Sequence, residues 1–199
     1  MSRFIETIKI VEGKPRNLFH HSKRFNSTRS VFFPAAPALD LQEWIHIPAQ
    51  GKSGVIKCRV TYSDIIENIE FEPYAPSIIR SLRIVEDNHI EYSFKYKNRN
   101  RLSYLFEQRQ NNDDVMIVKK GRITDSSFSN LIFLRDKSWY TPLHPLLPGT
   151  KREYLLGRNM IRSEEIFIDH LFQFEKVALI NAMLDPGDCV IDIQQIRGI

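Results

Sequence analysis

Four basic residues alternate along a short stretch of the chain, at Lys95, Lys97, Arg99 and Arg101. If this stretch is extended, their side chains lie on one face of a strand. A solvated basic face is the ordinary interpretation. The alternative is an anion-facing strand on which one lysine turns inward, where neighbouring cations favour the free amine that attacks a carbonyl carbon. Charge alone does not choose between Lys95 and Lys97.

Three further stretches carry groups that could hold an anion or a proton. Asp125 precedes small polar residues and an apolar strand, a pattern that also describes an ordinary loop with an Asx turn. The residues 148–152 open a predicted helix, and N–H groups at such an opening bind phosphate, although most Gly-Thr starts are only caps. Arg24 shares a predicted helix with His21, and its guanidinium could bind phosphate or simply lie at the surface.

The composition is that of a soluble globular protein and sets limits on the partners. Of 199 residues, 42% are hydrophobic and 26% charged, and 28 basic against 24 acidic side chains give a net charge of +4. This excess is too small to indicate nucleic acid, but it suits an anionic small molecule. Cys58 and Cys189 show no metal spacing, so we expect reduced thiols, no metal and a cytoplasmic protein. No export signal or membrane span is visible, so we expect no membrane partner.

The elements that position these groups divide the chain into two parts. The pattern of the first part predicts a small α+β unit with strands at 3–10, 55–62, 65–73 and 81–87. It also predicts a helix that begins at residue 18 and continues past residue 29, and a short helix at 39–45. The second part predicts helices at 102–109, 151–159 and 169–174 and strands at 115–119, 130–134, 139–142, 161–167, 177–182 and 190–193. We expect the boundary near residue 88, which gives domains 1–88 and 89–199.

Taken in order, these pieces resemble the fold-type IV, or class IV, aminotransferase family of pyridoxal-phosphate (PLP) enzymes over nearly the whole chain. Each matching stretch is weak alone, but the ordered set is specific. The stretches are 4–9 ("FETI(R/K)"), 21–25 ("HxxRL"), 57–62 ("(K/R)hRhhh"), 125–133 ("E-x-x-x-x-N-h-F") and 140–152 ("TP…L.G…R").

Within the family, residues 97–102 are most similar to the "K-x-x-N-R-L" of aminodeoxychorismate lyase. Branched-chain aminotransferases carry a tyrosine five places after the lysine, where this chain has Leu102. The residues 180–183 also resemble the lyase's "C-N-A-L". The resemblance therefore selects Lys97 over Lys95.

The resemblance implies an α+β fold with a small N-terminal α/β domain and a larger C-terminal β-barrel-like domain with flanking helices, as in D-amino-acid aminotransferase. It implies PLP as cofactor, held covalently by Lys97, which also moves the proton. Asp125 would bond the pyridine nitrogen, although it is one methylene shorter than the family's glutamate. The remaining cofactor-binding residues would be Arg24, Thr150, Lys151, Asn181 and Ala182, with main-chain N–H groups serving at positions 150 and 151.

The preferred hypothesis is a lyase that converts 4-amino-4-deoxychorismate, a small anionic amino substrate, to 4-aminobenzoate and pyruvate in folate biosynthesis. Lys9, Arg99 or Arg101 could meet the substrate's carboxylates. Transamination of a D- or branched-chain amino acid is the second hypothesis. A degenerate, non-catalytic relative is the third, because the family's "D-R-G…G-D-G" segment is absent ahead of the first strand. By analogy with the family we expect a homodimer.

Overall fold

The computed structural model describes residues 2–49 and 53–198, and it divides the chain into two compact units. The first unit extends to Pro76 and also includes Phe94–Asn98, whereas the second comprises Ser77–Ser93 and the chain from Arg99 onward. The change of unit thus falls at Pro76 rather than near residue 88. None of the helices in the described residues has the length and apolar composition needed to cross a membrane.

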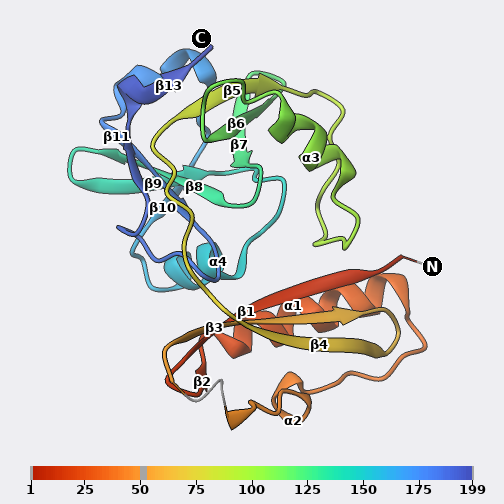
Figure 1. The fold of residues 1–199 in the computed structure, drawn as a ribbon. Helices are drawn as coiled ribbons and strands as arrows, with labels where there is room; N and C mark the ends of the chain where they lie inside the picture. The colour runs from red at the N-terminus through yellow and green to blue at the C-terminus, as the bar shows by residue number, and fades with distance from the viewer. Residues whose placement is uncertain (1, 50–52, 199) are drawn as a thin grey trace. The chain divides into compact units, whose positions relative to one another are not determined.

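The first unit is an antiparallel sheet covered by one long helix (Figure 1). Its elements are β1 (Phe4–Val11), β2 (Lys14–Pro15), α1 (Leu18–Phe32), α2 (Leu41–Trp44), β3 (Val55–Tyr62) and β4 (Ile66–Pro73), with strand order β2-β1-β3-β4. Phe4 and Ile8 of β1 pack with Phe25 of α1 in one buried cluster. Alternate β1 residues therefore face α1, which confirms the predicted strand–helix pair.

The second unit is built on a nine-stranded mixed sheet (Figure 1). Its strands are β5 (Leu82–Glu86), β6 (Asp114–Lys119), β7 (Arg122–Ser126), β8 (Asn130–Arg135), β9 (Ser138–Pro142), β10 (Arg162–Glu164), β11 (Lys176–Ile180), β12 (Val190–Asp192) and β13 (Ile196–Arg197). The main path is β10-β9-β8-β7-β6-β5-β13, and β11 also pairs with β8. The helices are α3 (Asn100–Glu107) and α4 (Thr150–Gly157), with 3₁₀ helices at Ile168–Gln173 and Ile193–Gln195. Mixed strands with few helices confirm the predicted α+β class.

A tight hairpin turn joins β6 to β7 and sets their register. Lys120 and Gly121 have φ angles of 53° and 73°, the left-handed pair that a two-residue type I′ turn requires. Lys119 pairs directly with Arg122 across this turn. The turn therefore places β7, and with it Asp125, beside the buried strand β6.

Three sequence-based expectations differ from the structure. The alternating basic face ends early, because Asn100 already begins α3 and Arg101 lies on that helix rather than on a strand. Asp125 lies on strand β7 instead of in a loop. The strand at 81–87 pairs in parallel with β6 and so belongs to the second unit's sheet. A short apolar run shows that a strand is present, but not which sheet it joins.

Candidate active site

A buried carboxylate forms the centre of the polar cluster in the second unit. Asp125 is 5% exposed and pairs with Asn130 across the β7–β8 turn. Its Oδ1 accepts a 2.8 Å hydrogen bond from Asn130 Nδ2, and its Oδ2 accepts a 2.9 Å bond from the Leu147 N–H. Burial raises the pKa of Asp125 to about 6, although these hydrogen bonds and the Arg152 charge act in the opposite direction.

Asn130 ties this carboxylate to the beginning of helix α4. Its amide nitrogen also donates to the Leu147 carbonyl, over 2.8 Å. A Cβ on Gly149, the N-cap residue of α4, would lie only 2.0 Å from Asn130 Oδ1. Only a glycine allows this close approach without a shift. The predicted residues Thr150 and Lys151, both buried, follow in the first turn of α4.

No side chain caps the N-terminus of α4. The first N–H groups of a helix lack intrahelical acceptors, and the positive end of the helix dipole favours an anion there. The Lys151 side chain forms an ion pair with Asp185, so the backbone of position 151 rather than its side chain is the group available to a phosphate.

Asn181 joins the same cluster from the end of β11. The pairing of Ile180 with Asn130 brings the two strand ends together. Asn181 Nδ2 donates a 2.8 Å hydrogen bond to Ser129 Oγ, and its Oδ1 accepts from the N–H groups of Met183 and Leu184. Ala182 is half-buried within this turn. Five of the predicted site residues are thus brought together in one unit: Asp125, Thr150, Lys151, Asn181 and Ala182.

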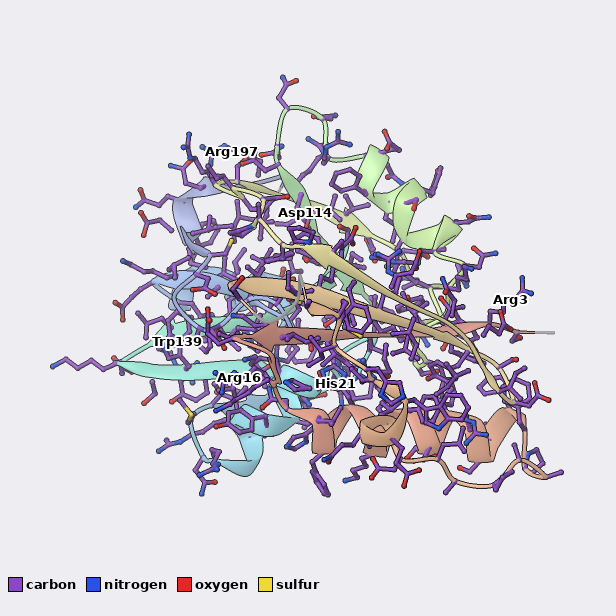
Figure 2. All side chains as sticks on the ribbon, turned by 60° about the horizontal axis from the view of Figure 1, so that its bottom comes forward. Arg3, Arg16, His21, Asp114, Trp139 and Arg197 are labelled. Carbon is purple, nitrogen blue, oxygen red and sulfur yellow. The ribbon has the colours of Figure 1, made fainter. Side chains whose placement is uncertain are left out.

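The first unit holds the other two predicted residues, Arg24 and Lys97, and Arg24 contacts a second buried carboxylate, that of Glu6. Arg24 donates to Glu6 through Nε at 2.8 Å and Nη2 at 2.6 Å, and His21 Nδ1 lies 2.6 Å from Glu6 Oε2. Burial alone would raise the pKa of Glu6, but Arg24 and His21 outweigh it and lower the value to about 2. In Figure 2, His21 lies between α1 and the sheet of this unit. Glu6 takes two of the five guanidinium N–H groups, and the phosphate role of Arg24 stays a prediction.

Sequence reasoning missed the role of Glu6, although a signal was present. His21 and Arg24 are three residues apart on α1, so they share one helical face. Glu6 lies on the strand that this face covers. A carboxylate on the otherwise apolar face of this strand, opposite a histidine and an arginine, predicts a buried ion pair.

The two candidate lysines differ in their surroundings. Lys97 is exposed, whereas Lys95 is half-buried. Burial lowers the pKa of His21, and the charges of Arg24 and Lys95 lower it further, while Glu6 acts in the opposite direction. Lys95 therefore lies within electrostatic range of the buried Glu6–His21–Arg24 cluster.

Two of the basic groups considered for substrate carboxylates, Arg99 and Arg101, bond acceptors within the second unit. Arg101 forms an ion pair with the buried Asp87, with Nε 2.5 Å from Oδ2, and Arg99 donates over 2.6 Å to the Ser127 carbonyl. Lys9 lies on β1. These contacts give Arg99 and Arg101 structural roles within the second unit.

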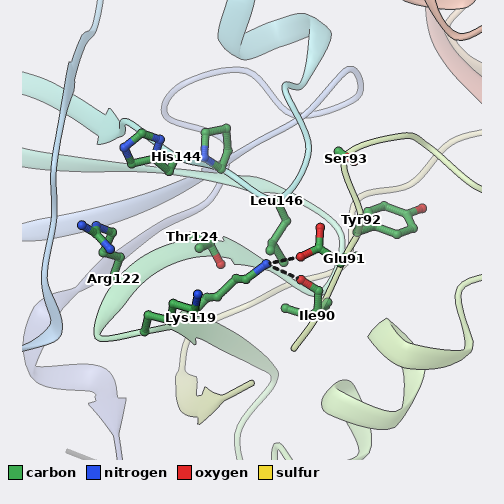
Figure 3. Close-up of a pocket in the computed structure, with 11 residues that line it drawn as sticks. Ile90, Glu91, Tyr92, Ser93, Lys119, Arg122, Thr124, His144 and Leu146 are labelled. Atoms are coloured by element: carbon green, nitrogen blue, oxygen red, sulfur yellow. Dashed lines mark hydrogen bonds and ion pairs between the residues drawn. The ribbon is translucent and has the colours of Figure 1, made fainter. Parts of the chain in front are cut away.

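A separate cavity of about 370 Å³ lies in the second unit beside β7 (Figure 3). Thr124 lines it, and successive residues of a strand point to opposite faces. Lys119 Nζ crosses it to the Ile90 carbonyl and Glu91, each at 2.7 Å. Arg122 and His144 line its other side. None of the predicted site residues contributes to this cavity.

Comparison with known proteins identifies the family. The class IV amino-transferase model matches residues 3–186. An uncharacterised protein of Haemophilus influenzae is 36% identical over 185 residues, covering 92% of this chain and 98% of that protein. A structure from Haemophilus somnus, provisionally named a 4-amino-4-deoxychorismate lyase, is 34% identical, with a TM-score of 0.85 over 92% of this chain and 97% of its own.

A hypothetical aminotransferase of Mycobacterium tuberculosis, solved with PLP bound, shares the fold at 16% identity, with a TM-score of 0.77 over 99% of this chain and 82% of its own. The chain belongs to the class IV aminotransferase family and is an enzyme of that PLP-dependent family. Membership confirms the predicted family, the predicted cofactor and the prediction that the protein is an enzyme.

The second unit's residues fit PLP on physical grounds. A buried carboxylate without a cation in hydrogen-bond contact is costly, which is why the pKa of Asp125 is raised. A protonated pyridine nitrogen is the kind of N–H donor that this carboxylate lacks. The uncapped N-terminus of α4 lies within the same cluster and suits a phosphate.

Proposed function

We propose that this enzyme is a PLP-dependent lyase that converts 4-amino-4-deoxychorismate to 4-aminobenzoate and pyruvate. The observation that supports it most is the Asp125–Asn130–Leu147 cluster beside the start of α4. One compact unit thus combines a buried carboxylate with an anion-binding helix end. The 34% identity to the provisionally named lyase of Haemophilus somnus supports the same choice.

When bound, PLP supplies an electron sink for the carbon next to the substrate's amino group. The chain's residues do the rest. Asp125, ionised, holds the proton on the ring nitrogen, and the N–H groups of Thr150 and Lys151 bind the phosphate with help from Arg24, while Asn181 and Ala182 form the adjoining wall. A lysine of the segment 95–97 would remove the proton from the substrate's ring carbon that bears the amine. The bond from the neighbouring ring carbon to the enolpyruvyl oxygen would then break with its electrons, and the departing enolpyruvate would take up a proton from the lysine to become pyruvate. The resemblance assigns this role to Lys97.

A product assay tests the proposal. Purified enzyme loaded with PLP is incubated with 4-amino-4-deoxychorismate, and 4-aminobenzoate is measured against a variant with both Lys95 and Lys97 replaced by alanine. We expect product from the wild type only. Equal amounts from both proteins would refute the lyase assignment.

Transamination of a D- or branched-chain amino acid is the second candidate, because the family includes aminotransferases. The two reactions differ in their need for a donor. A transaminase passes the donor's amino group to the cofactor, so its visible absorbance falls when an amino acid alone is added. We expect no such change here.

We further propose a cytoplasmic homodimer that supplies 4-aminobenzoate to folate biosynthesis. Both cysteines, Cys58 and Cys189, are buried and unbridged, which suits a reducing compartment. The family's typical oligomeric organisation supports the dimer. A fractionation experiment that finds the protein outside the cytoplasm would contradict the first part.

A further inference from the structure

The cavity beside β7 is formed entirely by residues of the second unit. Its walls come from three segments of the chain, residues 90–93, 119–124 and 144–146 (Figure 3). Its volume of about 370 Å³ is in the range of pockets that enclose small organic molecules. Ile90 and Leu146, which are 1% and 7% exposed, give it apolar surface, and basic side chains line the rest. Walls of these two kinds suit a molecule with an apolar body and an anionic group.

Two of the basic residues lie directly opposite each other on the β6–β7 hairpin. Lys119 pairs with Arg122 across the turn. Residues opposite each other in an antiparallel pair have their side chains on one face, and like charges in such positions repel and destabilise the pair. Lys120 adds a third cation. Among the described residues that line the cavity, Glu91 carries the single carboxylate. A further anion between the cations would therefore relieve their repulsion.

Lys119 is held in the cavity by the main chain as well as by an ion pair. Its ammonium group donates to the Ile90 carbonyl and to Glu91 Oε1, each over 2.7 Å (Figure 3). An ammonium group has three N–H donors, so one remains for another acceptor. The Lys119 side chain is only 23% exposed, whereas that of Glu91 is 79% exposed. Because water screens an exposed carboxylate, another anion can replace Glu91 at little cost.

Arg122 is oriented by residues that do not line the cavity. Its Nε donates to Glu165 over 3.0 Å, and its guanidinium carbon lies 5.2 Å from the centre of the Phe167 ring. The ion pair uses only one of the five guanidinium N–H donors. The other four are on the Nη groups, which match a carboxylate with two parallel hydrogen bonds.

We propose that this cavity is a binding site for a small carboxylate with an apolar body. The carboxylate bonds the Nη groups of Arg122 and the third N–H of Lys119, in the place that Glu91 now occupies. The apolar body packs on Ile90 and Leu146. None of the predicted cofactor-binding residues lines this cavity, so the ligand is not the substrate and the inference does not depend on the proposed reaction.

Binding of benzoate to the PLP-loaded protein tests the site, with the heat of binding measured by calorimetry at constant ionic strength. We expect saturable binding of benzoate. Benzamide lacks the charge and acetate lacks the apolar body, so each should bind at least about 10-fold more weakly. No binding of benzoate would overturn the proposal, and so would equal binding of benzamide or acetate.

Substitutions in the cavity should change the affinity for benzoate in opposite directions. K119Q and R122Q should each weaken binding by about 10- to 100-fold, the effect of losing a charged hydrogen bond. E91Q should strengthen binding by about 3-fold, because it removes the competing carboxylate. A loss of folding cannot imitate this gain.

E107Q is the matched control, because Glu107 is an exposed acid of α3 that does not line the cavity. We expect its affinity for benzoate to equal that of the wild type. Unchanged affinity in E91Q, or in both cation variants, would show that benzoate binds elsewhere and would overturn the proposal.

Discussion

At the scale of single residues, Asp125 combines a stability cost with a chemical role. Its side chain is buried and bonded only to neutral donors, so ionisation is opposed by desolvation. A pKa of about 6 for Asp125 means that the carboxyl is largely ionised near neutral pH. It then offers a negative charge that a pyridinium N–H would neutralise. We therefore expect Asp125 to strengthen PLP binding while it lowers the stability of the PLP-free protein.

Replacing Asp125 with asparagine should show this trade-off. Because the folded pKa lies above the unfolded value of 3.8, the folded state holds the proton more tightly, and stability falls as pH rises from about 4 to 6. The ionised carboxyl costs on the order of 3 kcal/mol. In urea unfolding of PLP-free protein, the free energy of unfolding should therefore change less between pH 5 and pH 8 in D125N than in the wild type. D125N should also bind PLP more weakly than the wild type. Asp136→Asn, at an exposed turn, is the control, and equal pH dependence in all three proteins would contradict the argument.

Glu6 gives stability the opposite pH dependence from Asp125, because the folded pKa of Glu6, about 2, lies below its ordinary value of 4.5. Its charge stabilises the fold above about pH 4.5, and this contribution is lost as pH falls toward 2. Glu6→Gln leaves Arg24 without its carboxylate and should cost about 3–5 kcal/mol at pH 7, and much less at pH 3. Urea unfolding at both pH values measures this.

The control for Glu6 is the Lys57–Glu72 ion pair on neighbouring strands of the same sheet, in which Glu72 is exposed. Glu72→Gln should cost less than about 1 kcal/mol, because water screens an exposed pair. A similar cost for both substitutions at pH 7 would show that the buried cluster is not a special source of stability.

At the scale of elements, helix α4 and strand β8 are coupled through one close approach. The Asn130 side chain occupies the space that a Cβ on Gly149 would need. Gly149 has φ −72° and ψ 144°, an ordinary extended conformation, so the glycine is required by packing rather than by backbone geometry. Displacing Asn130 would loosen both Asp125 and the start of α4.

Gly149→Ala should therefore weaken PLP binding by about 10-fold, roughly the effect of one lost hydrogen bond. Gly157→Ala is the matched control at the other end of α4, where an added Cβ meets nothing within 4 Å. A titration of the cofactor's absorbance measures both. Equal affinities in the two variants would show that Asn130 adapts without loss.

Some helices and strands could be predicted from the sequence alone, and others could not. Residues 55–62 have strand alternation and form β3 with those bounds, and the helix expected from residue 18 is α1. Local pattern could not show that β5 joins the second sheet, nor that α3 begins at Asn100 and ends the basic strand. The cluster of Asp125 with Thr150 and Asn181 was named from resemblance. The contacts of Asn130 with Asp125 and Gly149 hold this cluster together. They depend on strand register and on one interatomic distance, which cannot be deduced from the spacing of residues in the sequence.

At the scale of the whole molecule, the proposed homodimer is directly measurable. The chain has a mass of 23.4 kDa. Sedimentation equilibrium at micromolar concentration should give about twice that mass, because family members are typically oligomeric. The mass of a single chain at all concentrations would contradict the dimer while leaving the proposed chemistry of the site open to the other tests.

In the lyase reaction both products come from one substrate, so the complete enzyme should need no second substrate. PLP-loaded enzyme is given 4-amino-4-deoxychorismate with no amino acid present, and pyruvate and 4-aminobenzoate are measured in the same sample. The account predicts equal amounts of the two products, formed over many turnovers without a donor. Activity that stops after one turnover unless an amino or keto acid is supplied would show a transaminase and contradict the account.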